Sequence, residues 1–347
     1  MRIMHVNLGG FGGTVDGISA AESQLLRLLS EAGHQSFRLD RQGALSPAGA
    51  IRAVATARRM RVDVVHLHSL FRPAHCLLAR TLRAWNIPYV VSPHSALAPA
   101  ALRRDGFRKR LFLDLLDRSM LRGATAVICL TPREHQDVLS ACPDARTAIV
   151  PNPHVFDAET RWSWCPSQRP TILTLARYDV YHKGLDYLSW IARALPEADF
   201  RVHGVPDHNE VELIGAVART APANYSLEPP VVGPAKAHAL AGADLYIQAS
   251  RWEGLSISLI EAFAVGVPTV VSAQVADTVP MRVQGLGLVM PRDPTLAAEA
   301  IRRLLDDPDR QRAMSDAGSA WVRAALAPER VIPLLEEVYL TASGLNS

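Results

Sequence analysis

The stretch ADLYIQASRWEGLSISLIEAFAVGVPTVVSA, residues 243–273, contains a strand–helix–strand pattern. Residues 243–250 and 268–273 are short apolar runs typical of buried strands, and a small hydroxyl-bearing turn precedes the apolar helix between them. Strands that alternate with helices pair in parallel beneath those helices. The stretch therefore predicts an α/β fold, and Glu253 and Glu261 lie where such a fold binds ligands.

The same alternation runs through the rest of the chain with one interruption, at 152–170, which lacks periodicity and is rich in proline and tryptophan. Its other strand-like segments are 2–8, 34–40, 62–68, 87–94, 123–131, 147–153, 171–178, 199–205 and 229–233. We predict two Rossmann-like, doubly wound parallel-sheet domains, 1–153 and 154–329, that face each other across an interdomain cleft. A last helix is predicted at 330–342.

Composition limits the class of protein. The 347 residues carry a formal net charge of +3, too small at this length to indicate nucleic acid as the main partner. Four cysteines without paired spacing favour buried thiols in a reducing compartment. No secretory h-region and no apolar run of about 20 residues occurs, so we expect a cytoplasmic protein.

The turn within 250–268 has two interpretations. Ser258 and Glu261 fit a Ser-x-x-Glu capping box, which gives Glu261 a structural explanation. Glu253 lies before the turn and has no such explanation. The backbone amides of 255–257, at a helix N-terminus, would favour an anion. A phosphate on these amides and two carboxylates that accept from hydroxyl groups suit a nucleotide sugar.

The segment LARYDVYHKGLDYL, residues 175–188, follows another predicted strand. Arg177 and Lys183 are spaced so that both cations could reach one pyrophosphate, Arg through a forked contact and Lys as a point charge. An ordinary solvated loop is the alternative. The neighbouring glutamate turn favours the phosphate interpretation.

The glycine-rich segment LGGFGGTVDGIS, residues 8–19, follows the first predicted strand. It lacks the third glycine of a dinucleotide fingerprint, so NAD binding with Asp40 is a weak hypothesis. A tight turn that lets the backbone of Gly12 and Gly13 approach a phosphate or sugar is the alternative.

Three histidines follow or end predicted strands. His94 could donate to or accept from a sugar hydroxyl or phosphate oxygen, although a lone histidine is more often structural. His66 and His68 alternate, so both point to one face of a strand. We favour His68 as a cleft-lining residue and His66 as structural, since no carboxylate or cysteine partner for a metal lies nearby in sequence.

Two charged segments complete the candidates. Residues 103–110 are basic and amphipathic, compatible with peripheral contact with the anionic inner face of a membrane or with a solvated helix face. Asp307-Pro-Asp309 matches a two-aspartate metal motif but is interpreted as a turn. We predict no required metal and no cofactor.

Together these motifs resemble the retaining nucleotide-sugar glycosyltransferases of family 4, which have the GT-B arrangement of two facing Rossmann-like domains. The residues 243–272 resemble the glutamate-x7-glutamate signature of that family, and 175–188 resemble its Arg…Lys-Gly donor segment. The resemblance extends over nearly the whole chain through VVHLHS (64–69), YVVSPHSALAP (89–99) and IVPNP (149–153). It implies that the C-terminal helix, within 330–347, packs back on the first domain.

The resemblance implies a role for each matching residue. Glu253 would lie against the transferred sugar, Glu261 would hold the ribose hydroxyls, and Arg177 and Lys183 would bind the diphosphate and stabilise the leaving group. His94 would lie near the transferred sugar and the acceptor. Backbone contacts to phosphate and residues on the acceptor side would come from Gly12, Gly13, Gly254, Leu255, Ser256 and Ile257, and from His68 and Ser95, respectively.

Two departures from the family pattern concern these sites: Ser95 replaces a glycine after the histidine, and Ser256 replaces a frequent glycine in the phosphate loop.

The implied reaction is metal-independent transfer of a hexose-type sugar to a saccharide, lipid-linked or small-molecule acceptor, in polysaccharide, glycolipid or natural-product glycoside biosynthesis. A non-catalytic nucleotide- or sugar-binding protein and a two-carboxylate glycoside hydrolase are the alternatives.

Overall fold

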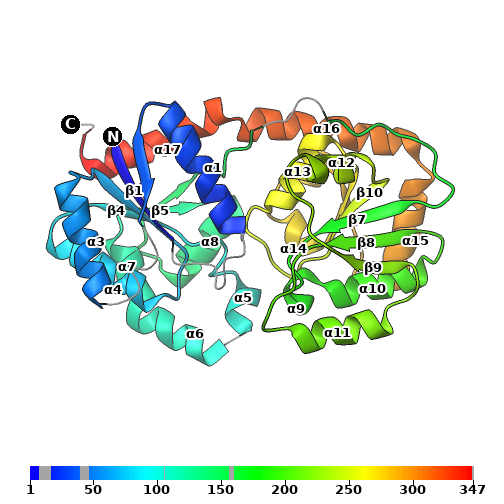
Figure 1. The fold of residues 1–347 in the computed structure, drawn as a ribbon, viewed down its shortest axis with the longest axis horizontal. Helices are drawn as coiled ribbons and strands as arrows, with labels where there is room; N and C mark the ends of the chain where they lie inside the picture. The colour runs from blue at the N-terminus through cyan, green and yellow to red at the C-terminus, as the bar shows by residue number, and fades with distance from the viewer. Residues whose placement is uncertain (8–16, 40–46, 105, 156–159, 346–347) are drawn as a thin grey trace. The chain divides into compact units, whose positions relative to one another are not determined.

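The computed structural model describes residues 1–7, 17–39, 47–104, 106–155 and 160–345. It contains two compact domains, one formed by 1–153 with 326–347 and the other by 154–325. Each domain has one six-stranded sheet in which all paired strands run parallel, with helices on both faces (Figure 1). This confirms the predicted α/β class and the two parallel sheets.

The first sheet has the strand order β2-β1-β3-β4-β5-β6. Its strands are β1 (Arg2–Asn7), β2 (Gln35–Arg38), β3 (Val64–His68), β4 (Tyr89–Ser92), β5 (Ala126–Cys129) and β6 (Thr147–Ile149). Its helices are α1 (Gly17–Glu31), α3 (Pro47–Arg59), α4 (Pro73–Ala84), α5 (Pro99–Arg103), α6 (Gly106–Phe112), the π-helical turn η1 (Leu113–Asp117), α7 (Arg118–Gly123), α8 (Pro132–Ala141) and α17 (Pro328–Ser343).

Both faces of the first sheet are covered, which explains why β3 and β4 are apolar or buried along their whole length. On one face α1 and α17 pack together, and Val331, Leu335 and Tyr339 of α17 join the core over β1, β3 and β4 (Figure 1). A second apolar cluster fills the other face beneath α3, α4 and α7. The last helix is thus an integral layer of the first domain.

The second sheet has the strand order β12-β11-β10-β7-β8-β9. Its strands are β7 (Thr171–Leu175), β8 (Asp199–His203), β9 (Tyr225–Glu228), β10 (Leu245–Gln248), β11 (Thr269–Val271) and β12 (Leu288–Val289). Its helices are α9 (Val180–Lys183), α10 (Leu185–Ala194), α11 (Val211–Thr220), α12 (Pro234–Ala241), α13 (Ile257–Val265), α14 (Ala273–Ala276), α15 (Pro294–Leu305) and α16 (Pro308–Leu326).

One strand prediction in this domain is wrong. Residues 229–233, PPVVG, are not a strand; β9 is the preceding segment YSLE, 225–228. Two consecutive prolines lack the N–H groups that a ladder needs, so pairing stops where they begin. Among the described residues, no helix has both the length and the apolar composition that would let it cross a membrane.

Candidate functional site

The segment after β7 places Lys183 at the end of a short helix. Asp179 caps α9 by accepting a hydrogen bond from the His182 amide at 2.9 Å. Gly184 then turns the chain with a φ of 68°. A Cβ on Gly184 would lie 2.4 Å from the carbonyl oxygen of Ala249, just after β10. Glycine is therefore required for this turn to pack against the end of β10.

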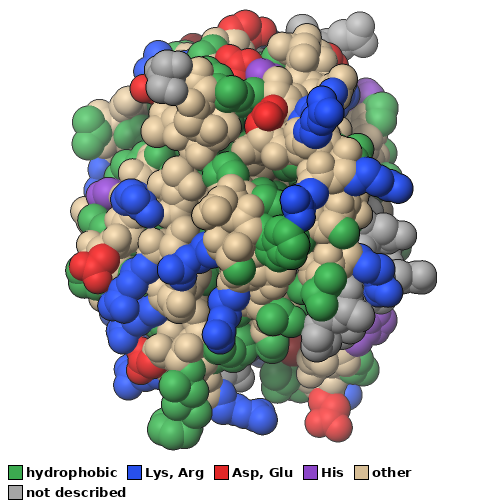
Figure 2. All heavy atoms as spheres, turned by 90° about the vertical axis from the view of Figure 1, so that its left-hand side faces the viewer, with side chains coloured by type: hydrophobic (Ala, Val, Ile, Leu, Met, Phe, Trp, Pro, Cys, Tyr) green, Lys and Arg blue, Asp and Glu red, His purple; other side chains and the backbone are tan. Residues whose placement is uncertain are grey.

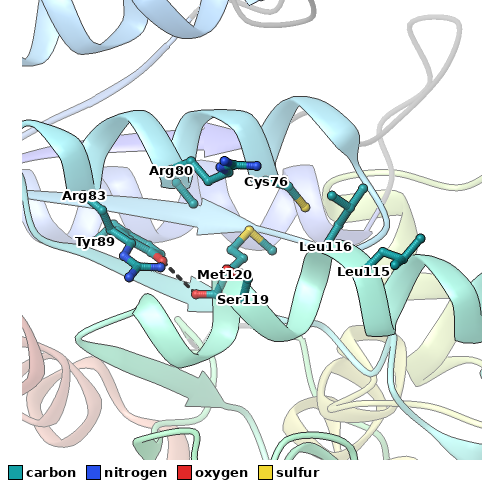
Figure 3. Close-up of a pocket in the computed structure, with 9 residues that line it drawn as sticks. Cys76, Arg80, Arg83, Tyr89, Leu115, Leu116, Ser119 and Met120 are labelled. Atoms are coloured by element: carbon teal, nitrogen blue, oxygen red, sulfur yellow. Dashed lines mark hydrogen bonds between the residues drawn. The ribbon is translucent and has the colours of Figure 1, made fainter.

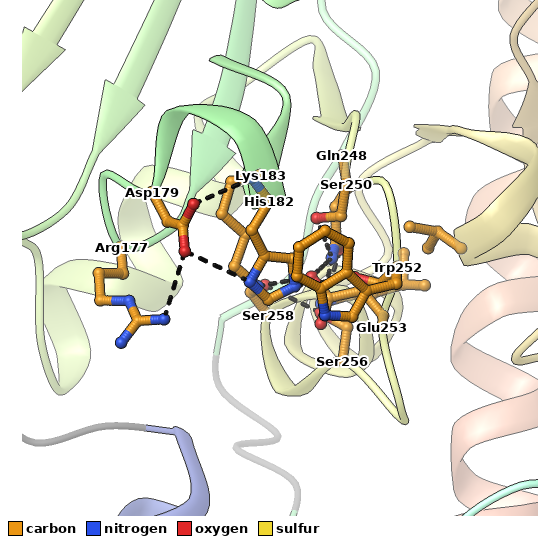
Figure 4. A network of polar contacts seen from close by, with 12 residues as sticks. Arg177, Asp179, His182, Lys183, Gln248, Ser250, Trp252, Glu253, Ser256 and Ser258 are labelled. Carbon is orange, nitrogen blue, oxygen red and sulfur yellow. Dashed lines mark hydrogen bonds and ion pairs between the residues drawn. The ribbon is translucent and has the colours of Figure 1, made fainter. Parts of the chain in front are cut away.

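The segment after β10 supplies the carboxylate that meets Lys183. Lys183 Nζ lies 2.5 Å from Glu253 Oε1, although the two residues are 70 positions apart (Figure 4). Gln248, the last residue of β10, donates from Nε2 to the same carboxylate oxygen and to Ser256 Oγ, both at 3.0 Å. The structure thus brings Lys183, Glu253 and Ser256 together at the carboxyl end of the second sheet.

The environment of Glu253 keeps it ionised. Burial alone would raise its pKa, but the Lys183 ammonium group and hydrogen bonds from Lys183 and Ser250 outweigh burial and hold the pKa of Glu253 below its usual value. The side chains of Lys183 and Glu253 are only 18% and 10% exposed. Either charge left alone there would be costly, so a ligand that separates the pair must bring its own charge.

The predicted capping box of Ser258 and Glu261 is wrong. Ser256 is the N-cap of α13, and its Oγ accepts from the Leu259 amide at 3.4 Å. The helix starts earlier than predicted because extended backbone at Ser256, with a ψ of 118°, places this hydroxyl over the first turn. Across the described parts of the chain, the amides of 255–257 donate to no protein acceptor, so this helix end can receive an anion.

Glu261 pairs with a lysine and not with a backbone amide of a capping box. Its Oε1 lies 2.5 Å from Nζ of Lys236 on α12, and both side chains are partly buried. Burial and the nearby Lys236 lower the pKa of His154 to about 4. Sequence reasoning did not single out Lys236, because a lone lysine in the segment 231–239 has no partner at helical or strand spacing.

Arg177 is about half exposed and held by long contacts. Its guanidinium nitrogens lie 3.8 Å from Asp179 Oδ2 and 3.6 Å from Asp207 Oδ2. Such contacts are longer than the charge-assisted hydrogen bonds of a fixed pair. The guanidinium group therefore remains able to turn toward a bidentate anion.

Two contacts missed by sequence reasoning join the loops after β7 and β10. The His182 ring stacks on Trp252 with centroids 4.0 Å apart and planes 5° apart, and His182 Nε2 donates to the Trp252 carbonyl oxygen at 2.9 Å (Figure 4). Arg251 donates to both carboxylate oxygens of Asp186, at 3.0 and 2.7 Å. No spacing signal links residues so far apart in sequence.

In the first domain, His94 and Ser95 form a strained turn after β4. Both have left-handed backbone, with φ of 51° and 59°. Glu134, buried in the first turn of α8, holds the turn by accepting from the Ser95 amide at 2.6 Å and from the Leu130 amide at 2.7 Å. Burial raises the pKa of Glu134, and these two hydrogen bonds oppose the rise. Sequence reasoning did not identify Glu134.

His68 lies beneath His94. It is only 2% exposed, and its Nδ1 lies 3.1 Å from His94 Nε2, so its described contact toward the end of the sheet is through His94. His66 is equally buried and hydrogen-bonds to Tyr339 Oη at 2.8 Å and to Ser92 Oγ at 2.7 Å. His66 therefore ties α17 to β3 and β4.

The described residues contain one group that could hold a metal ion, the buried imidazoles of His5, His66 and His68. The rings of His66 and His68 stack with centroids 4.0 Å apart and planes 27° apart. Nitrogen lone pairs lie in the ring plane, so stacked rings do not direct them at one ion. Asp307 accepts from the Arg310 amide at 3.0 Å, as a turn residue at the start of α16.

The remaining sequence candidates differ in what the structure says of them. Gly12, Gly13 and Asp40 lie outside the described residues. Residues 103–110 contain the end of α5 and the start of α6. A pocket of about 40 Å³ between α4, η1 and α7 has room for a few waters rather than a sugar (Figure 3). It is lined by Cys76, Ala79, Arg80, Arg83, Tyr89, Leu115, Leu116, Ser119 and Met120.

Comparison with known proteins gives matches to both domains. Residues 14–153 match the model of the glycosyl transferase 4-like domain, and residues 169–307 match that of glycosyl transferases group 1. The chain is 33% identical over 193 residues to a GDP-mannose-dependent alpha-(1-6)-phosphatidylinositol monomannoside mannosyltransferase of Mycobacterium tuberculosis. That match covers 48% of this chain and 46% of the relative, so the chain spans about half the relative's length.

A second relative and a solved structure agree with these matches. The chain is 28% identical over 277 residues to a phosphatidyl-myo-inositol mannosyltransferase of the same organism, covering 75% of this chain and 69% of the relative. The fold of this chain is similar to that of sucrose-phosphate synthase from Thermosynechococcus elongatus, with a TM-score of 0.81 and 17% identity. The match covers 97% of this chain and 98% of the synthase. The chain belongs to the family 4, group 1 glycosyltransferases.

Proposed function

We propose that the chain transfers a hexose-type sugar from a nucleoside diphosphate sugar to a hydroxyl acceptor, with retention at the anomeric carbon and without a required metal ion. The observation that carries the proposal is the Lys183–Glu253 pair in the domain whose α13 has open N-terminal amides. An ammonium group and open amides suit the negative charge that grows on a departing diphosphate. The relative whose name specifies GDP-mannose supports a nucleotide-sugar donor.

On the donor side, Lys183 and Arg177 bind the diphosphate together with the amides of 254–257. Glu253 lies against the transferred sugar once the diphosphate has replaced it as the partner of Lys183. Glu261 leaves Lys236 to accept from the ribose hydroxyls. Each exchange replaces a lysine–carboxylate pair with contacts to a ligand that carries both charge and hydroxyl groups, so neither buried group is left unpaired.

On the acceptor side, His94 contacts the transferred sugar and the acceptor. His68 lies beneath His94, and Ser95 follows it in the sequence. Gly12 and Gly13 add backbone contacts to phosphate. The acceptor is a saccharide, a lipid-linked saccharide or a small molecule, in polysaccharide, glycolipid or natural-product glycoside biosynthesis.

In the reaction, the bond between the anomeric carbon and the diphosphate oxygen breaks while the acceptor oxygen bonds to the same carbon on the same face. The acceptor proton passes to the leaving-group oxygen, which Lys183 and Arg177 stabilise. Glu253 and Glu261 are each paired with a lysine ammonium group, which counts against the glycoside hydrolase alternative, because a hydrolase needs one carboxyl group that stays protonated as a general acid.

A peripheral membrane contact belongs to the same proposal. Phe107, Leu111 and Leu115, at four-residue spacing along α6 and η1, are 80%, 47% and 67% exposed. Basic residues lie close to them in the sequence, within 103–110. On the face of the molecule that Figure 2 presents, Lys and Arg side chains lie among hydrophobic ones. An exposed apolar stripe with basic neighbours suits an anionic bilayer surface.

The donor site is tested by thermal unfolding with UDP, GDP, ADP, dTDP and their sugars, with EDTA or magnesium. One nucleotide should raise Tm in EDTA by mass action, and Lys183→Met should remove that rise while Arg302→Met, on a surface ion pair of the same domain, keeps it. The matching sugar nucleotide should then give a product with retained anomeric configuration by NMR. Absence of any nucleotide shift would refute the donor site, and an inverted product would refute retention.

The membrane contact is tested by flotation with vesicles of phosphatidylglycerol and phosphatidylcholine against phosphatidylcholine alone. The chain should float with the anionic vesicles, and Phe107→Ser with Leu115→Ser should reduce flotation several-fold without lowering Tm, because both side chains are exposed. Equal flotation of wild type and variant would show that this stripe is not the contact.

A further inference from the structure

Three imidazoles of the first domain lie in a line. His5 Nδ1 is 3.0 Å from His68 Nε2, and His68 Nδ1 is 3.1 Å from His94 Nε2. The ring planes of each pair are 18° and 19° apart, with centroids separated by 5.3 and 5.4 Å. In each pair, the distance between the ring centroids is close to the nitrogen–nitrogen distance plus the distance from each centroid to its own nitrogen. The two nitrogens therefore lie nearly on the line that joins the centroids. The rings therefore lie nearly coplanar and edge to edge.

His5 and His68 each carry a single ring proton at neutral pH. Burial and the nearby Arg38 lower the pKa of His5 to about 3, and burial lowers the pKa of His68 well below its usual value. A neutral imidazole has one N–H and one lone pair. In a line of such rings, the direction of donation in one hydrogen bond fixes the direction in the next.

Two arrangements satisfy both hydrogen bonds, and they differ at the ends. With protons on Nδ1, His5 donates to His68 and His68 donates to His94. With protons on Nε2, donation runs the other way and leaves an N–H on His5 Nε2, a buried atom with no partner among the described residues. Proteins avoid a buried N–H without an acceptor more strictly than a bare acceptor.

His66 holds the middle ring in place. Its ring stacks on His68 at 4.0 Å, and its two nitrogens are fixed by Tyr339 and Ser92. Rotation of His68 would break both in-line hydrogen bonds and this stacking. The direction of donation is therefore set by the whole buried group rather than by His94.

We propose that His5 and His68 are positioning residues that fix His94 as the tautomer with its proton on Nδ1, so that His94 acts toward a ligand as a hydrogen-bond donor and not as a base. Its ligand at this nitrogen is then an oxygen acceptor, such as a sugar hydroxyl or a phosphate oxygen. The link to catalysis rests on the proposed function of His94; the tautomer itself does not.

The test is ¹⁵N NMR of the full chain labelled at histidine, with the His94 signals assigned by their loss in His94→Gln. Wild-type His94 should show a protonated Nδ1 and an unprotonated Nε2. His68→Asn places an amide N–H near the lost Nδ1 and should keep this tautomer, whereas His68→Leu should shift His94 toward Nε2–H. A protonated Nε2 in wild type, or an unchanged tautomer in folded His68→Leu, would overturn the proposal; the wild-type result decides even if His68→Leu does not fold.

Turnover gives the catalytic readout. With the donor found above, His68→Leu should lower kcat by about 100-fold, the usual cost of a mispositioned contact, with donor KM nearly unchanged. His68→Asn should restore most of that loss. If wild type transfers no sugar but its His94 tautomer is as expected, the proposed function fails and the tautomer assignment stands. If wild type transfers sugar but has the opposite tautomer, the tautomer assignment fails and the proposed function stands.

Discussion

Replacing Lys183 by methionine would leave the Glu253 carboxylate in a place that is only 10% exposed without its cation. Removing one partner of a fully buried ion pair costs about 3–5 kcal/mol. Here both side chains keep some exposure, and Gln248 still donates to Glu253 Oε1 at 3.0 Å. We therefore expect Lys183→Met to lower the free energy of unfolding by about 2–3 kcal/mol at pH 7.5, below that range.

The loss should depend on pH in a direction that the structure fixes. In wild type the folded pKa of Glu253 is lowered, so its stabilisation is present above the unfolded pKa of 4.5 and is lost as pH falls through the folded value. Without Lys183, burial raises the folded pKa above 4.5. The variant then recovers relative to wild type as pH falls from 7.5 toward 4.5, because its carboxylate becomes neutral.

Urea unfolding followed by tryptophan fluorescence measures the effect, since five of the six tryptophans lie in the second domain. Lys183→Met with Glu253→Gln should recover much of the loss, because no unpaired charge remains. Arg302→Met, which breaks an exposed pair with Glu197, should cost no more than about 1 kcal/mol. The reasoning fails if the Lys183→Met loss is the same at pH 7.5 and 5.0, or if the double variant is no more stable than the single one.

Gly184→Ala should lower Tm in calorimetry more than Gly285→Ala. Both positions have left-handed backbone, which costs a residue with a Cβ about 1–2 kcal/mol, but only the Cβ at 184 would also clash with a neighbouring carbonyl. Equal losses would contradict the close approach of Gly184 to that carbonyl. Glu134→Gln should cost about 1–3 kcal/mol in urea unfolding, because an amide can accept from only one of the two N–H groups that the carboxylate satisfies. Histidines such as His5 and His75, with pKa lowered to about 3 and about 4 chiefly by burial, should make stability fall from pH 6.5 down to those values by up to about 1.4 kcal/mol per pH unit each; a flat Tm across pH 6.5 to 4 would contradict this.

Local sequence signals predicted the strand-end loops well. The apolar runs before Arg177 and Glu253 fixed which edge of the sheet these residues occupy, because parallel strands present their carboxyl ends together. The resemblance of the glutamate signature added their roles, which remain predictions. Gly184 belongs to the Arg…Lys-Gly segment that the sequence shows. The Ala249 carbonyl that approaches it could not be predicted from the sequence.

The partners of these residues could not be predicted. Lys236 meets Glu261, and Glu134 meets Ser95, through contacts that depend on how helices pack on the sheet rather than on spacing along the chain. The capping box failed for a related reason: both Ser256 and Ser258 can cap, and the backbone conformation decides between them. The left-handed φ of Ser95 gives a physical reason for the glycine that the family usually has there.

The place of α17 has a consequence for how the chain folds as it is made. Residues 1–153 leave the ribosome first, yet one face of their sheet lacks Val331, Leu335 and Tyr339 until about 180 more residues have been synthesised. Until then, the Nδ1 side of buried His66 has no Tyr339 hydroxyl, and the part of the apolar face over β3 and β4 that α17 covers is open to water. The domain that begins first therefore finishes last, and a ribosome that stalls within 154–325 leaves a nascent chain with an unfinished sheet for chaperones to cover.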